Sequence, residues 1–552
     1  MYFKMAIMSS AWRGVVVFIA LFAVGLGAAQ DITFDQIRDG LKDPARWLTY
    51  SGDYHGTRHS PLTQITPANV AEIAPRWTFQ TGIPGKFEAT PITVDGVLYV
   101  SGPENNAWAI SARNGRTIWR YQRRNLPDGL SVCCGRVNRG LAVHRNKLFM
   151  VTLDAHLVAL DMKSGAVVYD VVIDDHTKGY TGTVAPLVVK DKVIVGIAGA
   201  EYGIRGFIDA FDAETGRRAW RFWTVPGPGE PGHDTWSGES WKEGGATTWV
   251  TGSYDPDLNL LFWGTGNPSP DHFGDVRKGD NLYSASLVAL DAETGRLKWH
   301  FQFTPHDTHD YDSTHVPVLA DVDVAGRRRK LVMVANRNGF YYTFDRTNGA
   351  FLGARPFIRQ TWAREIGPSG RPVRMPDIDP NDNGVTVCPD ALGGTNFMSP
   401  SFSPATGLFY VMARETCGTF WGWDSERIEG QLYEGGAMSF PPGVVRYGAI
   451  RALDAVTGEG RWEFRLVSPA WGGLLSTASG LLFGGDQEGN IIALDAATGK
   501  HLWHYTLGAP IYAAPTTIMV DGRQLVLMPS GTTLTAFALP ARLLSSLAPS
   551  RP

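Results

Sequence analysis

Two adjacent cysteines, Cys133 and Cys134, stand in the stretch "SVCCGRVNRG", and the 552-residue chain has only two others, Cys388 and Cys417. A thiol pair has one meaning in a reducing cytosol and another in an oxidising compartment, where neighbours can be joined in a disulfide. Two free cysteines, or two that pair separately, are the alternative. The chemistry of the pair therefore depends on where the protein is sent.

The N-terminus has the pattern of a secretory signal. Lys4 and Arg13 precede the apolar stretch "GVVVFIALFAVGLGAA", in which Gly27 and Ala29 are placed for signal peptidase. The stretch is shorter than the roughly 20 apolar residues of a membrane-spanning helix, and no later run approaches that length. We predict that residues 1–29 are a cleaved signal peptide and that the mature chain is exported. An uncleaved N-terminal anchor is the alternative.

The charge of the chain argues against a nucleic-acid partner. Its 51 Lys and Arg residues are balanced by 54 Asp and Glu residues, which gives a net charge of −3. The one basic run, "GRRRK" at 326–330, lies between two apolar segments and is interpreted as a solvated hairpin turn. A nucleic-acid-binding domain would instead carry a basic patch or stripe.

A repeated phrase indicates the fold. Seven copies of an apolar strand, an Asp-x-x-(Thr/Ser/Asn)-Gly turn and a second strand are visible, for example "VALDAETGRLKWHF" at 288 and "IALDAATGKHLWHY" at 492. The Asp side chain bonds forward to the turn backbone and Gly supplies a positive φ, so each copy predicts a hairpin. Most copies follow another hairpin. Two hairpins make one four-stranded blade.

We predict an all-β fold, a single eight-bladed β-propeller with W-type docking motifs that spans about residues 45–540 of one domain over 30–552. An eighth copy of the phrase is split between "PRWTFQTG" at 75 and "LTAFALP" at 534. Pairing these two ends would close the ring and remove exposed sheet edges. The wide gaps between copies predict long insertions around 225–285 and 356–450, and such loops usually carry function.

A series of unusual motifs resembles the quinoprotein alcohol dehydrogenases, the methanol and ethanol dehydrogenase family. These are periplasmic enzymes that use pyrroloquinoline quinone (PQQ) and a bound metal ion. The resemblance covers nearly the whole mature chain. Its motifs, in chain order, are "FEATP" at 87, "CCGRVNRG" at 133, "AGAEYGIRG" at 198, "GGATTW" at 244, "GTGNPSP" at 264, "TPHDTHDYD" at 304 and "ANRNGFYYTFDRTNG" at 335.

The resemblance implies a role for the adjacent cysteines. Cys133 and Cys134 would form a ring disulfide that lies as a stiff, flat platform against one face of the quinone. Trp249 matches the tryptophan on the other face, although packing within a blade is its alternative role. Cys388 and Cys417 would form a loop-closing bridge across the second insertion.

Because PQQ is a tricarboxylate, the pocket should supply cations, hydroxyl groups and backbone N–H groups. Arg139 matches the arginine beside the platform, and Glu88 and Arg337 match residues at the quinone oxygens. The remaining residues that match the cofactor pocket are Thr183, Ala198, Gly199, Ala200, Thr247, Asn396 and Trp471.

The metal ligands implied by the resemblance are Glu201, Asn267, Asp310 and Asp312, all oxygen donors suited to a hard cation. Asp312 matches a position that is small and neutral in calcium-using methanol dehydrogenases and is an aspartate in the lanthanide-using branch. Three carboxylates around one ion suit a trivalent lanthanide, which we favour over Ca²⁺. The alternative is a calcium enzyme in which Asp312 bonds only to loop backbone.

The implied activity is the oxidation of primary alcohols to aldehydes. Asp310 matches the catalytic base, which takes the proton of the alcohol while the carbinol hydrogen leaves as hydride to metal-bound PQQ. The sequence has no Cys-x-x-Cys-His motif for a haem of its own, so a separate soluble cytochrome c is the expected electron acceptor. A homodimer is one expected assembly.

The substrate is a small alcohol whose identity the motifs do not give. Methanol-specific relatives have an aromatic residue shortly after the metal-binding asparagine, where this chain has Asp271 in "NPSPDHFGD". The difference favours a larger primary alcohol or a broad range. A different class of protein, the non-enzymatic propeller scaffolds of outer-membrane protein assembly, is the alternative, and a quinoprotein that oxidises aldoses is a third reading.

Overall fold

The structure is a computed structural model that describes residues 31–124, 126–127, 129–130, 132–324 and 326–543. The expected signal peptide, residues 1–29, lies outside the described residues. Within them, α1 (Phe34–Arg38) and residues 541–543 are α-helical, and the other regular elements are strands and short 3₁₀ helices. None of these helices is long and apolar enough to cross a membrane. The all-β prediction is confirmed.

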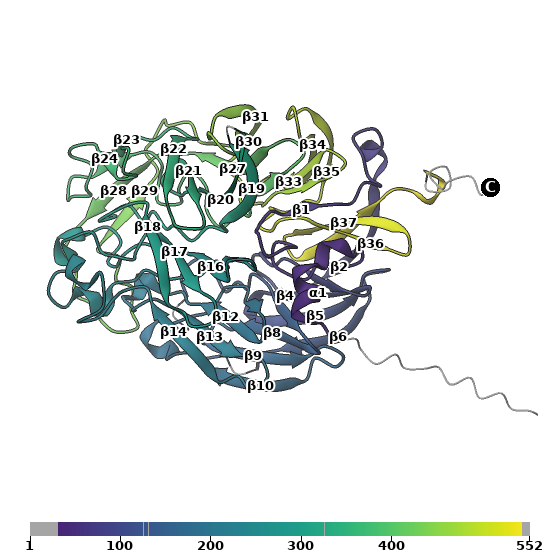
Figure 1. Cartoon of the computed structure of the whole chain (residues 1–552), viewed down its shortest axis with the longest axis horizontal. Helices are drawn as coiled ribbons and strands as arrows, with labels where there is room; N and C mark the ends of the chain where they lie inside the picture. Colours follow the sequence, from purple (N-terminus) through teal and green to yellow (C-terminus); the bar gives the residue numbers. More distant parts are fainter. Residues whose placement is uncertain (1–30, 125, 128, 131, 325, 544–552) are drawn as a thin grey trace, which may run out of the picture.

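Eight sheets with four antiparallel strands each dominate the described part of the chain, and Figure 1 shows them arranged around a common centre as in a propeller. The first four sheets are β3 (Ile92–Val94), β4 (Val97–Gly102), β5 (Asn106–Ser111) and β6 (Thr117–Gln122); β7 (Ala142–His144), β8 (Lys147–Val151), β9 (His156–Asp161) and β10 (Val167–Val172); β11 (Leu187–Val189), β12 (Lys192–Gly196), β13 (Phe207–Asp212) and β14 (Arg218–Trp223); and β15 (Ser253–Asp255), β16 (Leu260–Gly264), β17 (Ser286–Asp291) and β18 (Leu297–Gln302).

The other four sheets follow the same order of strands. They are β19 (Val318–Val324), β20 (Arg327–Ala335), β21 (Phe340–Asp345) and β22 (Phe351–Pro356); β26 (Ser401–Ser403), β27 (Leu408–Glu415), β30 (Tyr447–Asp454) and β31 (Gly460–Leu466); β32 (Leu475–Thr477), β33 (Leu481–Gly485), β34 (Asn490–Asp495) and β35 (His501–Thr506); and β36 (Thr516–Val520), β37 (Arg523–Ser530), β38 (Thr533–Ala538) and β2 (Ala74–Gln80).

The last of these sheets joins the two ends of the chain. Strand β2 pairs antiparallel with β38, and Trp77 lies opposite Ala536. Figure 1 shows the purple N-terminal segment against the yellow C-terminal strands. This confirms the pairing that the split eighth copy of the repeat predicted. The short strand β1 (His59–Ser60) adds a parallel fifth strand to the β32–β35 sheet, a contact that the repeat did not predict.

The repeated phrase folds as its chemistry requires. In the copy at Asp161, the carboxylate accepts hydrogen bonds from the backbone N–H and the hydroxyl of Ser164, and Gly165 has a φ of +71°. Trp119 of the preceding sheet packs on this turn, and its indole N–H donates to the carbonyl of Met162 at 2.9 Å. Equivalent bonds run from Trp77 to Ala112, from Trp220 to Ala292 and from Trp462 to Ala496.

Close packing of this tryptophan leads to a testable stability difference. A Cβ on Gly165 would lie 2.6 Å from the ring of Trp119, whereas a Cβ on Gly96, which also has a positive φ, would meet no atom within 4 Å. We expect Gly165→Ala to lower the free energy of unfolding by about 2–4 kcal/mol, because backbone strain and overpacking add. In the control Gly96→Ala, backbone strain alone should lower the free energy of unfolding, by only about 1 kcal/mol. Urea denaturation of both variants measures the difference, and equal losses would contradict the packing argument.

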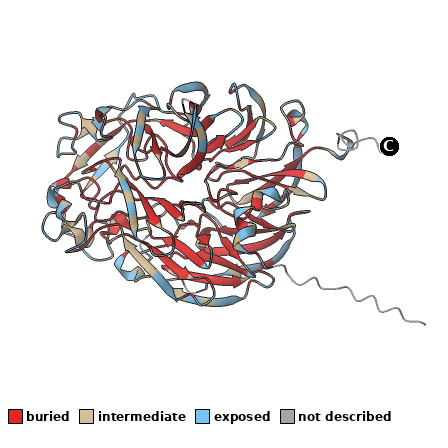
Figure 2. Ribbon diagram, viewed as in Figure 1, coloured by how far each residue is buried: buried red, intermediate tan, exposed pale blue. Residues whose placement is uncertain are grey.

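Apolar side chains between neighbouring sheets form the core. Figure 2 shows buried residues along the inner strands and exposed residues on the outermost ones. In the β7–β10 sheet, every residue of β8 is buried, whereas β10 alternates between exposed and half-buried residues. Continuous apolar runs such as that of β8 suit strands that are covered on both faces. The sheets therefore form a rigid frame for the loops between them.

The insertions predicted at 225–285 and 356–450 are not continuous, because β15 and β16 lie inside the first range and β26 and β27 inside the second. The segments between these strands carry smaller elements. The second range contains β23 (Ala363–Ile366) with β24 (Pro372–Arg374), and a sheet of β25 (Val385–Val387), β28 (Gly418–Gly422) and β29 (Gly436–Ser439). The expected Cys388–Cys417 disulfide is present here. The basic run at 326–330 does lie at a hairpin, but its charged residues belong to β20 rather than to the turn itself, and Arg328 lies opposite Asp323.

Candidate active site

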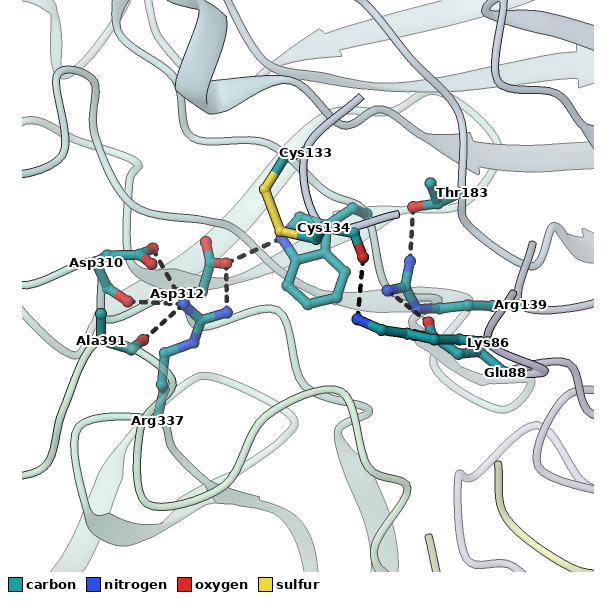
Figure 3. Close-up of a disulfide and its surroundings, with 11 residues drawn as sticks. Lys86, Glu88, Cys133, Cys134, Arg139, Thr183, Asp310, Asp312, Arg337 and Ala391 are labelled. Atoms are coloured by element: carbon teal, nitrogen blue, oxygen red, sulfur yellow. Dashed lines mark hydrogen bonds and ion pairs between the residues drawn. A yellow bond between two sulfur atoms is a disulfide. The ribbon is translucent and has the colours of Figure 1, made fainter. Parts of the chain in front are cut away.

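The expected bond between Cys133 and Cys134 is present, in the loop that joins β6 to β7. Both sulfur atoms and one carboxylate oxygen of Glu201 lie within 4.8 Å of one another. Because the sulfurs are bonded to each other, they are not thiolate ligands for a metal ion. Lys86 donates to the carbonyl of Cys134 at 3.1 Å, and Cys134 itself is exposed. The ring disulfide, shown with Lys86 in Figure 3, therefore lies beside the Glu201 carboxylate.

Trp249 lies in the loop before β15, where a hydrogen bond and two arginine side chains hold its indole ring. Its indole N–H donates to Asp312 Oδ2 at 3.0 Å. The Arg139 guanidinium carbon is 4.6 Å from the centre of its ring, and that of Arg337 is 5.9 Å away. Arginine over an aromatic face is a favourable arrangement. Both predicted arginines thus meet at the predicted tryptophan.

Arg139 and Glu88 form a buried ion pair, with side chains 6% and 3% exposed and an N–O distance of 2.9 Å. The guanidinium also donates to Thr183 Oγ1 at 2.6 Å. Burial raises the pKa of Glu88, and the charge of Arg139 opposes that rise. The Nε atom of Arg139 is buried and has no hydrogen-bond partner among the described residues. One cationic donor is therefore left for a ligand.

Arg337 connects the two aspartates of "TPHDTHDYD". Its guanidinium lies 3.0 Å from Asp310 Oδ1 and 2.8 Å from Asp312 Oδ2, and it also donates to the carbonyls of Asp310 and Ala391 (Figure 3). In Figure 3 this group lies on the opposite side of the ring disulfide from Arg139 and Glu88. The Nε atom of Arg337, like that of Arg139, is buried without a partner in the described chain.

Asp310 has a strained backbone, with a φ of +58°. Aspartate tolerates this left-handed conformation better than most residues, and such strain is concentrated at functional sites. Burial raises the pKa of Asp310 well above its usual value, Arg337 opposes the rise, and the negative charge of Asp312 adds to it. The side chain is 26% exposed, so a small molecule can reach it.

The carboxylates of Glu201 and Asp312 differ in their hydrogen-bond and ion-pair partners. Asp312 Oδ1 accepts from the backbone N–H of Asn267 at 2.8 Å, and a Cβ on Gly266 would lie 2.4 Å from the same oxygen. Glu201 has no ion pair in the described part of the chain, and burial, with repulsion from Asp312 and Glu434, raises its pKa to about 7. A cation bound between Glu201 and Asp312 would remove that repulsion.

The remaining predicted residues line the same loops. Ala198, Gly199 and Ala200 lead into the 3₁₀ turn that carries Glu201, and a Cβ on Gly199 would lie 2.1 Å from the carbonyl oxygen of Gly179. The carbonyl of Thr247 accepts from the N–H of Gly266 at 2.6 Å. Asn396 and Trp471 lie in later loops of the chain. The side-chain N–H of Asn396 donates to the carbonyl of Leu392, and Trp471 stacks on Phe397 with ring centres 5.7 Å apart.

Three contacts were not predicted from the sequence. Phe397 packs edge-on against Trp249, the guanidinium of Arg414 lies 4.2 Å from the centre of Trp471, and Lys86 donates to the carbonyl of Cys134. Lys86 directly precedes "FEATP", so that motif could have been extended by one residue, and Phe397 directly follows the predicted Asn396. Arg414 lies inside β27 and carries no motif signal.

These residues fit PQQ and a metal ion. Two buried guanidinium groups with unpartnered Nε atoms suit a planar tricarboxylate. Trp249 and the ring disulfide supply an aromatic and an apolar surface. The Glu201 carboxylate, which forms no ion pair with any described residue, suits a hard metal ion together with the oxygens of Asn267, Asp310 and Asp312.

Two families match this chain. Residues 47–353 match the family described as the β-propeller domain of glucose/ethanol/alcohol dehydrogenases that use PQQ. A shorter stretch, residues 446–540, matches the family described as the outer membrane protein assembly factor BamB. This second match covers only the strands from β30 onward, whereas the first includes the ring disulfide, the loops of Glu201 and Asn267, and Arg337.

Whole-length relatives agree with the first match. The chain is 37% identical over 548 residues to the quinoprotein alcohol dehydrogenase PedH of Pseudomonas putida, covering 93% of this chain and 92% of that protein. It is 37% identical over 478 residues to the lanthanide-dependent methanol dehydrogenase of Methylacidiphilum fumariolicum, covering 81% and 78%.

A solved structure of a europium-containing methanol dehydrogenase superposes with a TM-score of 0.87 at 34% identity, covering 92% of this chain and 100% of that one. The structure of the quinohemoprotein alcohol dehydrogenase of Comamonas testosteroni has a TM-score of 0.86 at 36% identity, covering 91% and 82%. Together with the ring disulfide, Trp249 and the paired arginines, these likenesses show that the chain belongs to the family of PQQ-dependent (quinoprotein) alcohol dehydrogenases.

Proposed function

We propose that this protein oxidises primary alcohols to aldehydes in the periplasm, with PQQ and one metal ion as cofactors. The observation that carries the proposal is the meeting of Asp310 and Asp312 at the buried Arg337, beside Trp249 and close to the Cys133–Cys134 ring. This arrangement combines an accessible carboxylate, a cation and a cofactor platform in one place. A non-enzymatic scaffold would need none of them.

Asp310 is the proposed general base. Its carboxylate accepts the O–H proton of the alcohol, and the Arg337 guanidinium at 3.0 Å favours the ionised form that can accept it. Arg337 also holds the Asp310 backbone by donating to its carbonyl at 2.8 Å, which fixes the direction of the side chain. When bound, PQQ would supply the acceptor for the hydride of the carbinol carbon, and the metal ion would supply Lewis-acid assistance.

The residues proposed to hold PQQ lie around Trp249 and the ring disulfide. Arg139 would pair with a carboxylate of the cofactor, and Thr183 would fix the Arg139 guanidinium. Arg337 would lie at the quinone oxygens. The other residues proposed for this pocket are Glu88, Ala198, Gly199, Ala200, Thr247, Asn396 and Trp471.

We propose Glu201, Asn267, Asp310 and Asp312 as the metal ligands and a trivalent lanthanide as the ion, with Ca²⁺ as the alternative. Three carboxylates favour the higher charge. The relatives named lanthanide-dependent methanol dehydrogenases and the europium-containing structure support this choice.

The finer features of the fold belong to the same proposal. We infer one domain over residues 30–552 in which the eight four-stranded sheets are blades, and in which tryptophans such as Trp119 dock each blade on the next. Residues 1–29 would be the signal peptide. A soluble cytochrome c is the proposed electron acceptor, as the name of the 1-butanol dehydrogenase (cytochrome c) of Thauera butanivorans suggests for that relative.

A primary alcohol larger than methanol, or a broad range of them, is the proposed substrate class. Asp271 is buried at the position where methanol-specific relatives carry an aromatic residue. Replacing a ring by a shorter side chain leaves more volume beside the metal loop.

Dye-linked alcohol oxidation tests the proposal directly. The purified chain would be reconstituted with PQQ and either La³⁺ or Ca²⁺, and assayed with primary alcohols of increasing length. We expect activity with La³⁺ that exceeds activity with Ca²⁺ by about tenfold or more, since ligand charge sets ion preference. Activity with Ca²⁺ alone would contradict the lanthanide proposal. Failure of PQQ to bind would contradict the enzymatic one.

A further inference from the structure

The side-chain amide of Asn267 is held from its nitrogen end. Nδ2 donates to Asp271 Oδ1 at 2.7 Å and to the carbonyl of Pro268 at 3.3 Å. The backbone N–H of Asn267 is used separately, by Asp312 Oδ1. No donor in the described part of the chain meets Asn267 Oδ1. The carbonyl oxygen is therefore the end that is left for a ligand.

The acceptor on Asp271 decides which way this amide points. If the Asn267 amide were reversed, its oxygen would face Asp271 Oδ1 at 2.7 Å and the carbonyl oxygen of Pro268 at 3.3 Å, and a carbonyl oxygen can only accept. Both residues are buried, Asn267 being 2% and Asp271 4% exposed, so water cannot relieve that repulsion. An apolar or aromatic residue at 271 could not impose this preference.

The backbone around Asp271 is itself rigid. The preceding carbonyl, that of Pro270, accepts from both Nε and Nη2 of the fully buried Arg277, at 3.1 and 2.9 Å. The N–H of the following residue, His272, donates to the carbonyl of Glu434 at 2.9 Å. A side chain fixed on both sides in this way can hold its hydrogen-bond partner in one orientation.

We propose that Asp271 is a positioning residue for the metal ion: it holds the Asn267 amide with its oxygen free to bind a cation. The inference rests on the proposed metal site. It assigns to Asp271 a task beyond widening the substrate pocket, and it makes the metal affinity of this chain depend on a residue that does not touch the ion. Loss of such an outer partner typically weakens metal binding by about 10–100-fold.

Europium luminescence tests this directly. The full-length chain containing PQQ would be titrated with Eu³⁺, and excited-state lifetimes in H₂O and D₂O would give the number of water molecules on the ion. We expect Asp271→Leu to weaken Eu³⁺ binding by about 10–100-fold and to add about one bound water, because the misoriented amide no longer supplies its oxygen. Asp271→Asn, which keeps an acceptor oxygen, is the matched control and should retain the wild-type water number.

Each outcome separates the inference from the metal site on which it rests. If the wild-type protein binds no Eu³⁺, the proposed metal site is wrong. If wild type binds Eu³⁺ and Asp271→Leu matches it in affinity and water number, the positioning role is wrong. The positioning role would also be wrong if Asp271→Leu and Asp271→Asn weakened Eu³⁺ binding equally and left the number of waters on the ion unchanged. The loss would then come from the missing negative charge alone. Should Asp271→Leu not fold, Asp271→Ser, which is too short to reach Nδ2, replaces it with the same expectations.

Discussion

Asp310→Asn is expected to lower kcat of the PQQ- and metal-loaded enzyme by roughly 10²–10⁴-fold, the usual contribution of a general base. Asparagine has nearly the same size and also tolerates the φ of +58° found here, so the loop should keep its shape. The amide can still accept a hydrogen bond from Arg337. What it cannot do is take a proton from the alcohol.

The alcohol makes this loss large. An aliphatic alcohol is a far weaker acid than a carboxylic acid, so transfer of its proton to a free carboxylate in advance of the oxidation is unfavourable. If Asp310 is the base, it must therefore accept the proton as the carbinol hydrogen leaves, and its position relative to the substrate should contribute most of the effect. Arg337, in contact with both the side chain and the carbonyl of Asp310, supplies that position.

Steady-state kinetics with a saturating dye acceptor measure kcat, and titration with PQQ shows whether the cofactor still binds. Asp280→Asn is a suitable control, because Asp280 forms an exposed ion pair with Arg371 and should leave kcat within about twofold. Full activity in Asp310→Asn would show that another group takes the proton. If Asp310→Asn lost PQQ binding as well as activity, Asp310 would be needed for binding the cofactor rather than for proton transfer.

Local chemistry explains why the sheets could be predicted. The turn at Asp161 is complete within five residues, since its carboxylate bonds to Ser164 and its glycine is Gly165. The pattern of apolar residues along each strand then indicates whether neighbouring sheets bury that strand. The pairing of β2 with β38 could be predicted for the same reason, because each half of the split phrase keeps its own pattern.

The residues of the site could be named from the sequence, but the contacts among them could not be predicted. Resemblance named Trp249, Asp312 and Arg337, but their mutual bonds join positions 63 and 25 residues apart, and no local pattern encodes such contacts. The parallel pairing of β1 with β32, which joins His59 to Ser476, is equally non-local. Asp271 was identified as a difference in the pocket wall, and its bond to Asn267 became visible only when the loop was folded.

These bonds change what a substitution at Asp312 should do. Its Oδ2 accepts from Trp249 and Arg337, and its Oδ1 accepts from the N–H of Asn267. Removing the carboxylate leaves a buried arginine without one of its partners and the indole N–H unpaired, which is costly whichever ion is present. We therefore expect Asp312→Ala to lower activity by about 100-fold or more with either La³⁺ or Ca²⁺.

The ratio of the two activities separates ion selection from this shared loss. If Asp312 is a ligand, its charge attracts a trivalent ion more strongly than a divalent one, so the La³⁺/Ca²⁺ activity ratio in Asp312→Ala should fall by a further tenfold or so. Trp249→Phe is the matched control: it removes the indole N–H bond to Asp312 but keeps an aromatic ring and all four proposed ligands. Its activity should drop equally with both ions. A ratio in Asp312→Ala that stays at the wild-type value would mean that Asp312 acts only by holding Trp249, Arg337 and the Asn267 backbone in place, and that the preference for a lanthanide arises from the other carboxylates of the site.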